Sequence, residues 1–395
     1  MTKEIENLVK KVISFSKQVY KENPIPLHRP IFEGNEKNFL SECIDTNFVS
    51  SVGKRVDEFE EKIASFTGSK YAVATVNGTS ALHIALKLLG VKEKTEVITQ
   101  SLTFVATCNS ISYLNAIPIF VDVDRDTMGM SPSALELFLK ENTIFRKGVL
   151  FNKKSDRKIS ACLPMHTYGY PCRIREIKKI CKDWNIPLLE DCAESLGSFI
   201  DKKHSGNFGV AGALSFNGNK LITTGGGGMI ITNNKKLASA AKHMTTTAKV
   251  PHPYNYIHNE IGYNYRLPNL NAALGCAQIE KIEFFLRQKR ILNDKWKKAL
   301  NEFNLNFLEE LENSTSNNWL NTIVLTSRKD RDKFLKLTNK KGVMTRPTWE
   351  LMSDLPMYKN CPRDNLSNSK FLRDRVVNLP SSVPHKMLSS TSIRS

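Results

Sequence analysis

The sequence predicts an α/β protein built on a mostly parallel sheet, with a smaller unit towards its C-terminal end. Between residues 70 and 240, short runs rich in β-branched residues alternate with longer runs whose apolar residues recur at helical spacing. Such alternation is typical of parallel strands joined by helices, and these sheets carry functional groups at the carboxyl ends of their strands. From about residue 276 a long charged helical stretch is followed by fewer strands, which predicts a separate α+β unit.

Each predicted strand of the first unit is a short apolar run bounded by turn-forming residues. In order, these runs are YAVATVN (71–77), TEVITQS (95–101), IPIFVDVD (117–124), KISACLPMH (158–166), IPLLEDC (186–192), GALSFNG (212–218) and GGMIITN (227–233). Helices are predicted between them at residues 79–90 and 175–185. Residues 278–303 predict the long helix of the second unit, and residues 321–349 predict a strand, a helix and a strand. An amphipathic helix is expected over residues 1–20.

The length of 395 residues suggests two or three domains. We expect an N-terminal helix and arm over residues 1–35, a large α/β domain over residues 36–275 and a small α+β domain over residues 276–395. No apolar run reaches the roughly 18 to 20 residues that span a bilayer, and the N-terminus lacks the apolar block of a secretory signal. The protein is therefore expected in the cytoplasm, without a membrane partner.

Cysteine spacing and net charge narrow the function classes. The eight cysteines include no C-x-x-C pair, which argues against a zinc ribbon or a thioredoxin-type motif, and no metal is predicted. Lys and Arg number 57 against 39 Asp and Glu, which gives a net charge of +18. A solvated basic surface is the preferred interpretation, followed by attraction of acidic small molecules. Nucleic-acid binding comes last, because the sequence carries no arginine-rich tail, zinc finger or RNP-type motif.

The stretch VNGTSALHIAL (76–86) joins a strand end, a glycine turn and the start of a helix. Free backbone N–H groups and the positive end of the helix dipole bind anions at such a point. Gly78, Thr79 and Ser80 are therefore candidates for holding a phosphate. The alternative is ordinary helix capping by Thr79 or Ser80.

The stretch LSFNGNKLITTGGGGM (214–229) places Lys220 between glycine-bearing turns. It does not fit a Walker A loop, because five residues separate Gly212 from Gly218 and a leucine follows the lysine. The glycine run also fails the dinucleotide pattern, since Ile230 occupies the place of the last glycine. The lysine itself remains as the chemical candidate, because an amine can act as a nucleophile and carry protons. The alternative is a surface lysine, which is far commoner.

A third stretch, IPLLEDCAESLG (186–197), ends an apolar strand with Glu190 and Asp191. Asp191 falls where α/β sheets present functional groups, and a carboxylate buried there needs a partner. A protonated pyridine nitrogen is such a partner. Pyridoxal phosphate enzymes combine a Schiff-base lysine, an acid on that nitrogen and an anion site for the phosphate. Lys220, Asp191 and the turn at 78–80 would supply these three groups.

Six motifs, taken in order, resemble the DegT/StrS family of pyridoxal phosphate-dependent nucleotide-sugar aminotransferases. They are NGTSALHIAL, TFVAT, HTYGYP, LLEDCAESLGS, LSFNGNKLITTGGGGM and GYNYRLPNLNAALGCAQ. Within the family, PLHRPIFEGNEKNFL, FVSSVGKRVDEFE and MTRPTW resemble the LegC branch, and the resemblance runs from about residue 25 to the C-terminus. It implies the fold type I of pyridoxal phosphate-dependent transferases, with a central, mostly parallel seven-stranded sheet in the large domain.

The resemblance implies a role for each matching residue. Lys220 would bond covalently to the cofactor, and Asp191 would pair with the ring nitrogen. Glu194 would lie near the ring hydroxyl, where the family often has Gln or His. Phe104 would stack on the ring face, unless it is a core aromatic residue. The phosphate would be held within one chain by Gly78, Thr79, Ser80 and Ser215, and across a homodimer with shared active sites by Asn264.

Three further residues are candidates near the substrate, each with an ordinary structural alternative. His166 could be a structural histidine at a strand end, and Arg266 and Arg346 could be surface ion-pair partners. Related dehydratases of this fold carry histidine in place of the lysine, so the presence of Lys220 favours amino transfer. Gly226 replaces the acid of the T-T-G-E-G-G motif found in many relatives, a difference that concerns substrate preference more than reaction type.

The reaction implied by the resemblance is transfer of the amino group of L-glutamate to a UDP-4-keto-6-deoxy-HexNAc sugar, towards products of the legionaminic acid type. Pyridoxal phosphate would alternate with pyridoxamine phosphate. One alternative is a dTDP-keto-sugar C3-aminotransferase. Another is a non-catalytic regulator of the same fold whose basic surface binds nucleic acid. The complete set of Lys220, Asp191 and phosphate-binding residues argues against the regulator.

Overall fold

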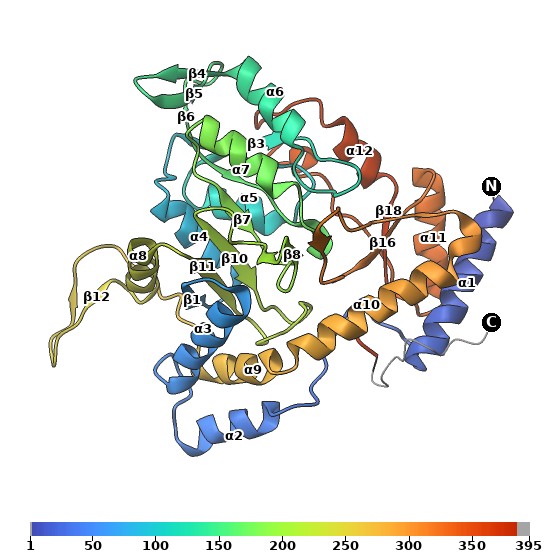
Figure 1. The fold of residues 1–395 in the computed structure, drawn as a ribbon, viewed down its shortest axis with the longest axis horizontal. Helices are drawn as coiled ribbons and strands as arrows, with labels where there is room; N and C mark the ends of the chain where they lie inside the picture. Colours follow the sequence, from blue (N-terminus) through green and yellow to red (C-terminus); the bar gives the residue numbers. More distant parts are fainter. Residues whose placement is uncertain (1, 385–395) are drawn as a thin grey trace.

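The computed structural model describes residues 2–384, and the end of the predicted C-terminal unit lies outside that range. In the part described, the large unit is built on seven strands in the order β1-β11-β10-β7-β6-β2-β3, where parallel bridges join β7 to β6 (Figure 1). Neighbouring strands are parallel except β11, which is antiparallel to β1 and β10. The mostly parallel sheet predicted from the sequence is therefore confirmed. Its strands are β1 (Tyr71–Thr75), β2 (Thr95–Gln100), β3 (Ile117–Val121), β6 (Lys158–Leu163), β7 (Leu189–Asp191), β10 (Ala211–Ser215) and β11 (Gly228–Thr232).

Helices cover both faces of this sheet. On one face, α4 and α8 pack against side chains such as Val73, Leu189 and Ile230. On the other face, α3 and α9 cover the β1 end and α6 and α7 cover the β3 end. Successive strand residues alternate between the faces, so Ala74 packs towards α3 while Val73 packs towards α4. The helices of this unit are α2 (Glu36–Asp45), α3 (Lys54–Thr67), α4 (Gly78–Leu88), α5 (Val105–Ser112), α6 (Pro132–Asn142), α7 (Ile174–Asp183), α8 (Lys235–Thr245) and α9 (Asn269–Ile279).

One hairpin of the main sheet and two small sheets extend the large unit. A hairpin of two strands pairs with the beginning of β6, and another hairpin, β12–β13, projects away from the body of the molecule (Figure 1). A three-stranded sheet, in the order β15-β8-β9, includes one strand from the C-terminal part of the chain and therefore links the two units. The strands are β4 (Thr143–Arg146), β5 (Val149–Asn152), β8 (Phe199–Ile200), β9 (Lys203–His204), β12 (Lys249–Val250), β13 (Ile257–His258) and β15 (Ser314–Thr315).

The smaller unit surrounds a four-stranded antiparallel sheet, in the order β14-β16-β18-β17. The apolar face of α1, including Leu8 and Val12, packs against Trp296 and Phe334 of this unit, so the N-terminal helix shares a core with the C-terminal part of the chain. The domain boundaries themselves remain a prediction. The elements are α1 (Thr2–Tyr20), α10 (Ile282–Ala299), β14 (Asn306–Phe307), β16 (Asn321–Val324), α11 (Arg328–Lys340), β17 (Arg346–Pro347), α12 (Ser367–Arg373) and β18 (Val376–Leu379), and the short 3₁₀ turns of the chain are Thr167–Gly169, Asn301–Phe303 and Met352–Asp354.

Two predicted elements differ from the structure. The helix expected over 278–303 is divided, because α9 ends at Ile279 against the large unit and α10 begins at Ile282 and crosses to the small unit (Figure 1). The strand expected over 343–349 is reduced to β17. The chain leaves the sheet at Thr348, whose hydroxyl accepts a hydrogen bond from the Tyr168 hydroxyl at 2.8 Å. Within residues 2–384, every helix is too short or too polar to span a lipid bilayer.

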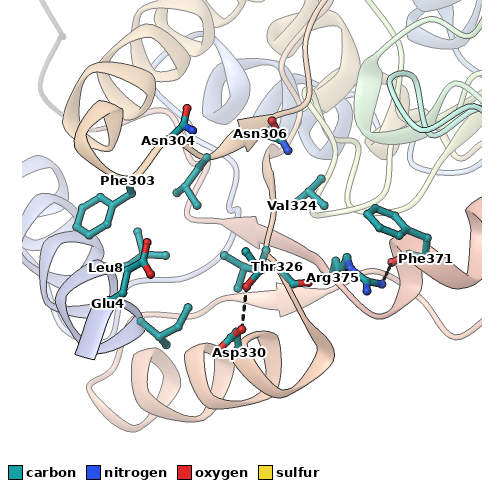
Figure 2. A pocket seen from close by; sticks show the side chains of 13 residues that line it. Glu4, Leu8, Phe303, Asn304, Asn306, Val324, Thr326, Asp330, Phe371 and Arg375 are labelled. Atoms are coloured by element: carbon teal, nitrogen blue, oxygen red, sulfur yellow. Dashed lines mark hydrogen bonds between the residues drawn. The ribbon is translucent and has the colours of Figure 1, made fainter. Parts of the chain in front are cut away.

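A cavity of about 360 Å³ lies in the small unit, between α1 and the strands β14 and β16 (Figure 2). Its lining is mostly apolar, and three of its polar side chains have partners within the chain. The Asp330 carboxylate accepts a hydrogen bond from the Thr326 hydroxyl at 2.8 Å, and Arg375 donates to the carbonyl of Phe371 at 3.1 Å. None of the site residues predicted from the sequence lines this cavity, so the chemistry lies elsewhere.

Candidate active site

A cavity of about 350 Å³ lies at the carboxyl ends of β7 and β10, beside the start of α4. Asp191 is the last residue of β7, Ser215 is the last residue of β10, and Gly78 is the first residue of α4. A parallel sheet brings such strand ends together at one edge, although the three segments are far apart in the sequence. Seven of the predicted site residues line the cavity: Gly78, Thr79, Phe104, Asp191, Glu194, Ser215 and Lys220.

Asp191 is a buried carboxylate, 2% exposed, at the floor of this cavity. One carboxylate oxygen accepts a hydrogen bond from the Thr107 hydroxyl at 2.7 Å, and the other accepts the backbone N–H of Ala193 at 3.1 Å. Burial raises the pKa of Asp191 above its ordinary value, although these two donors oppose the shift. A carboxylate in this condition gains stability from a cation placed in the cavity.

Glu194 and Lys220 form a pair on the wall of the cavity. The Nζ atom of Lys220 lies 3.3 Å from Oε1 of Glu194, and the two side chains are 12% and 1% exposed. The other Glu194 oxygen accepts the backbone N–H of Tyr168 at 2.8 Å. Burial raises the pKa of Glu194 to about 7, against the opposing charge of Lys220. The site therefore holds a second carboxyl group that can exchange a proton near neutral pH.

Lys220 lies in the turn between β10 and β11. Its backbone N–H donates to the carbonyl of Asn217 at 3.0 Å, which fixes the turn locally. The glycine run after the lysine allows two backbone segments to pack closely. A Cβ atom on Gly228 would lie 2.3 Å from the carbonyl oxygen of Asn77. Gly228 therefore lets β11 approach the backbone at the start of α4, and the lysine turn and the α4 turn meet at one cavity.

The start of α4 has the features of an anion site. The Asn77 side chain caps the helix by accepting the N–H of Ser80 at 2.8 Å, whereas Gly78 and Thr79 precede the first intrahelical hydrogen bond and line the cavity. Ser215 lies directly opposite, because a Cβ atom on Gly78 would come 2.9 Å from the Ser215 Cβ atom. Backbone N–H groups, the helix dipole and a hydroxyl therefore converge at this end of the cavity.

Aromatic residues complete the cavity, and only Phe104 among them was predicted from the sequence. Phe104 is 49% exposed and its ring centroid lies 6.3 Å from that of Trp349. The ring centroid of Trp319 lies 4.2 Å from Nζ of Lys220. Thr107, the hydrogen-bond donor to Asp191, was also missed. The tryptophans come from the C-terminal part of the chain, and their spacing to the other motifs carries no signal that sequence patterns could use.

His166 does not line the cavity, which corrects its expected place near the substrate. It is fully buried, its Nδ1 atom accepts the backbone N–H of Cys172 at 3.3 Å, and its Nε2 atom lies 3.1 Å from Glu190. Because Nδ1 accepts, the proton is on Nε2, which donates to the Glu190 carboxylate. The preceding residue, Met165, faces the cavity instead, since successive residues of an extended segment point in opposite directions. Within one chain, the contacts of His166 are those of a structural residue.

Four other predicted residues lie outside the cavity of this chain. Ser80 uses its N–H in the helix cap. Asn264 is exposed, and its side-chain oxygen accepts hydrogen bonds from Arg266 at 3.1 and 3.0 Å. Arg346 lies on the exposed strand β17 and donates to Asn339 at 2.9 Å, so within one chain it is a surface residue rather than a cavity residue.

Comparisons with known proteins give the family and the fold of this chain. Residues 30–390 match the model of the DegT/DnrJ/EryC1/StrS aminotransferase family. The GDP-perosamine synthase of Escherichia coli O157:H7 is 36% identical over 85% of this chain and 87% of the relative, and that of Vibrio cholerae is 32% identical over 90% and 94%. The structure of Helicobacter pylori PseC, an aminotransferase involved in the biosynthesis of pseudoaminic acid, superposes with a TM-score of 0.82 at 22% identity, covering 91% of this chain and 94% of that one.

Proposed function

Because this chain belongs to the DegT/DnrJ/EryC1/StrS aminotransferase family, we propose that it transfers the amino group of L-glutamate to C4 of a UDP-4-keto-6-deoxy-HexNAc sugar. Family membership makes it a pyridoxal phosphate-dependent aminotransferase, and the structural neighbours give it the fold type I of these enzymes. The observation that carries the proposal is the meeting of Lys220, Asp191 and the α4 turn in one cavity. The LegC-like motifs support the UDP-sugar and a place in the synthesis of legionaminic acid-type glycans.

The residues of the cavity fit this cofactor. A pyridinium nitrogen would supply the cation that the buried Asp191 carboxylate lacks, with Thr107 and Ala193 orienting the carboxylate. The phosphate would bind to Gly78, Thr79 and Ser215 at the start of α4. We propose Glu194 for the ring hydroxyl and Phe104 for the ring face. When bound, pyridoxal phosphate supplies an electron-withdrawing ring that accepts the charge left when a C–H bond next to nitrogen is broken.

Lys220 would carry the proton of the reaction. Its amine is the cavity's flexible base, held 3.3 Å from Glu194 and within reach of the space above Asp191. It would remove the proton from Cα of glutamate in the first half of the reaction and return a proton to C4 of the sugar in the second half. Asp191 would keep the positive charge of the ring nitrogen in place throughout. Proton transfer by a positioned group contributes roughly 10²–10⁴ in rate.

The nucleotide and the carbon that receives the amine have competing candidates. The relatives named GDP-perosamine synthase favour a GDP-linked sugar as the second candidate. A dTDP-linked sugar aminated at C3 is the third. The nucleic-acid-binding regulator is set aside, because the chain belongs to an aminotransferase family and has the lysine and the acid in one cavity.

Incubation of the purified enzyme with L-glutamate and single keto sugars would test the substrate. The panel contains UDP-, GDP- and dTDP-linked 4-keto and 3-keto 6-deoxy sugars, and mass spectrometry with NMR identifies each amino product. We expect an amine at C4 of the UDP-linked HexNAc sugar, with release of 2-oxoglutarate. Turnover confined to a GDP- or dTDP-linked sugar would replace the UDP assignment with the nucleotide found.

Replacement of the lysine would test the reaction centre separately. Lys220→Ala should bind the cofactor yet lack the visible absorbance of a covalently attached one, with turnover reduced by at least roughly 10²–10⁴. Lys179→Ala, at an exposed position of α7, is the matched control and should keep both. An unchanged absorbance band in Lys220→Ala would refute the assignment.

We also propose that the active unit is a homodimer in which Asn264 reaches the phosphate site of the partner. Asn264 is exposed and outside the cavity of its own chain. It follows the projecting β12–β13 segment (Figure 1), where Tyr254, Tyr256 and Ile261 are each at least 80% exposed. Clustered exposed apolar side chains of this kind indicate an interaction surface.

Subunit mixing would decide whether Asn264 acts across the interface. Inactive Lys220→Ala and weakened Asn264→Ala chains are mixed, exchanged and assayed against each alone. If Asn264 serves the partner, mixed dimers contain one intact site, and activity should approach about a quarter of the wild-type value in a symmetric twofold dimer. Activity no higher than that of the separate variants, or a monomer in light scattering, would contradict the proposal.

A further inference from the structure

Trp319 is a cavity-lining residue fixed by the large and small units together. It is 4% exposed, and its ring centroid lies 4.2 Å from Nζ of Lys220. Its indole N–H donates at 2.7 Å to the carbonyl of Asn219, the residue directly before the lysine. Its backbone carbonyl accepts a hydrogen bond from Lys289 on α10 at 2.6 Å. The indole is thus held to the lysine turn, and the backbone of Trp319 is held to α10.

We propose that Trp319 is a positioning residue for Lys220: its ring holds the protonated amine beside Glu194 whenever that amine is not bonded to the cofactor. The inference rests on the proposed role of Lys220. A lysine side chain has four rotatable bonds and no preferred geometry for its charge. Here two groups define the position of the charge, the Glu194 carboxylate at 3.3 Å and the ring face at 4.2 Å. Both attract an ammonium group.

Lys289 fixes the position of Trp319 from behind. Its side chain is fully buried, and its Nζ atom donates to the carbonyls of Trp319 at 2.6 Å and Ser381 at 2.5 Å. Burial lowers the pKa of Lys289 well below its ordinary value. Two N–H groups of the amine are thus used on backbone carbonyls. The backbone of Trp319 therefore has one defined place relative to α10 and to the segment at residue 381.

Asn317 joins both partners of Lys220 in one loop. Its side-chain oxygen accepts the backbone N–H of Trp319 at 2.9 Å, and its side-chain nitrogen donates to the carbonyls of Glu194 at 2.8 Å and Leu196 at 2.9 Å. The loop that places the ring therefore also fixes the backbone that carries the carboxylate. Because Asn317 bonds to the backbone of both Trp319 and Glu194, the ring and the carboxylate are positioned together. An aromatic residue that only filled the cavity wall would not need this connection.

Chemical labelling of cofactor-free protein would test this inference without depending on catalysis. Acetic anhydride is applied to wild type, Trp319→Leu, Trp319→Phe and the control Trp184→Leu, and labelling of Lys220 is followed by peptide mass spectrometry. Trp184 stacks on Phe145, with ring centroids 5.8 Å apart, in the outer part of the large unit. The fully buried Lys289 serves as an internal standard for opening of the structure.

We expect Trp319→Leu to raise the labelling rate of Lys220 by roughly 3- to 30-fold, because the amine is no longer held between the ring and the Glu194 carboxylate. The Phe variant should stay near the wild-type rate, since it keeps a ring face, and Trp184→Leu should equal wild type. In turnover with the substrate found above, Trp319→Leu should lower kcat with little change in KM. The same change would thus raise the reactivity of the amine and lower catalysis.

An unchanged labelling rate at Lys220 would overturn the inference, and so would a rise at Lys220 and Lys289 together, which would show a structural role only. If Trp319→Leu does not fold, Trp319→Met replaces it, because methionine keeps much of the volume without a ring. The labelling rates of Lys220 and Lys289 are then compared in the same way. Failure of the proposed function is seen separately, as full turnover by Lys220→Ala. The labelling result therefore bears on Trp319 alone.

Discussion

Glu190 and Asp191 are neighbouring buried carboxylates on β7 with opposite surroundings. Glu190 points away from the cavity, and four donors surround it: the Nε2–H group of His166 and the backbone N–H groups of Gly206, Phe208 and Gly209, at 2.6–3.1 Å. Burial opposes its ionisation, but these donors outweigh burial and lower the pKa of Glu190. Asp191 points into the cavity, has two donors, and has its pKa raised by burial.

The difference separates a carboxylate that stabilises the fold from one that is prepared for a ligand. A fully hydrogen-bonded buried charge is satisfied by the protein alone. A charge with free acceptor capacity beside a cavity is costly until a cation arrives. The sequence pointed to Asp191 from its place at the strand end, but only the structure shows that the adjacent, buried Glu190 is hydrogen-bonded by four donors of the protein itself.

Removal of Glu190 should give the largest effect on stability. Glu190→Ala leaves three backbone N–H groups and His166 without their acceptor, which should lower the free energy of unfolding by about 3–5 kcal/mol. Glu190→Gln keeps one acceptor oxygen and should lose less. Because the folded pKa of Glu190 is lowered, its contribution is present above the usual glutamate pKa and is lost as the pH falls through the folded value. Urea titration across acidic pH measures this, and unchanged stability in Glu190→Ala would contradict the comparison.

Neutralisation of Asp191 should lower activity without lowering the stability of the cofactor-free protein. Asp191→Asn should lower kcat by roughly 10²–10³, because the charge that faces the ring nitrogen is lost. Its cofactor-free form should unfold at the same or higher free energy than wild type, since a carboxylate with a raised pKa opposes folding where it is ionised. The exposed Asp183→Asn variant is the matched control. A destabilised Asp191→Asn protein would place this acid in the same class as Glu190.

Glu194 is intermediate between the two acids, because it lines the cavity but already has a partner in Lys220. In the folded, cofactor-free protein its pKa is about 7, so it keeps a proton between pH 4.5 and 7 that the unfolded chain releases. Its contribution to stability should therefore fall as the pH rises through this range, by at most about 3 kcal/mol. Glu194→Gln should remove that slope while keeping the acceptor for Tyr168. Chemical denaturation at a series of pH values compares the two proteins, and equal slopes would argue against the raised pKa.

The smallest expected effect concerns the donor to Asp191. Thr107→Val removes the hydroxyl at 2.7 Å, which should raise the pKa of Asp191 further and lower kcat about tenfold near neutral pH. Thr245→Val is the control, because Thr245 is equally buried but its hydroxyl donates only to carbonyls of α8. Steady-state kinetics of both variants measures the difference. Equal kcat values in the two variants would mean that Thr107 does not tune the acid.

Local pattern in the sequence determined the sheet and one end of the site. Strands such as residues 71–75 and 228–232 are recognised by short apolar runs, because helices cover both faces of this sheet. The carboxyl ends of two other strands carry Asp191 and Ser215, and the capped glycine turn before α4 has its own signature. Lys220 could be named because it lies just after a strand end and the order of the surrounding motifs restricts its role.

Only the tertiary structure decided which residues complete and orient the site. Trp319 and Trp349 arrive from the C-terminal part of the chain, and Thr107 reaches Asp191 from 84 residues earlier. The sequence also left open which side chains of β7 and of the segment at His166 point into the cavity. A shift of one residue along an extended segment exchanges the inward and outward positions. Burial and hydrogen bonding then made Glu190 structural and left Asp191 at the cavity. These properties arise from packing between distant segments, which no local pattern encodes.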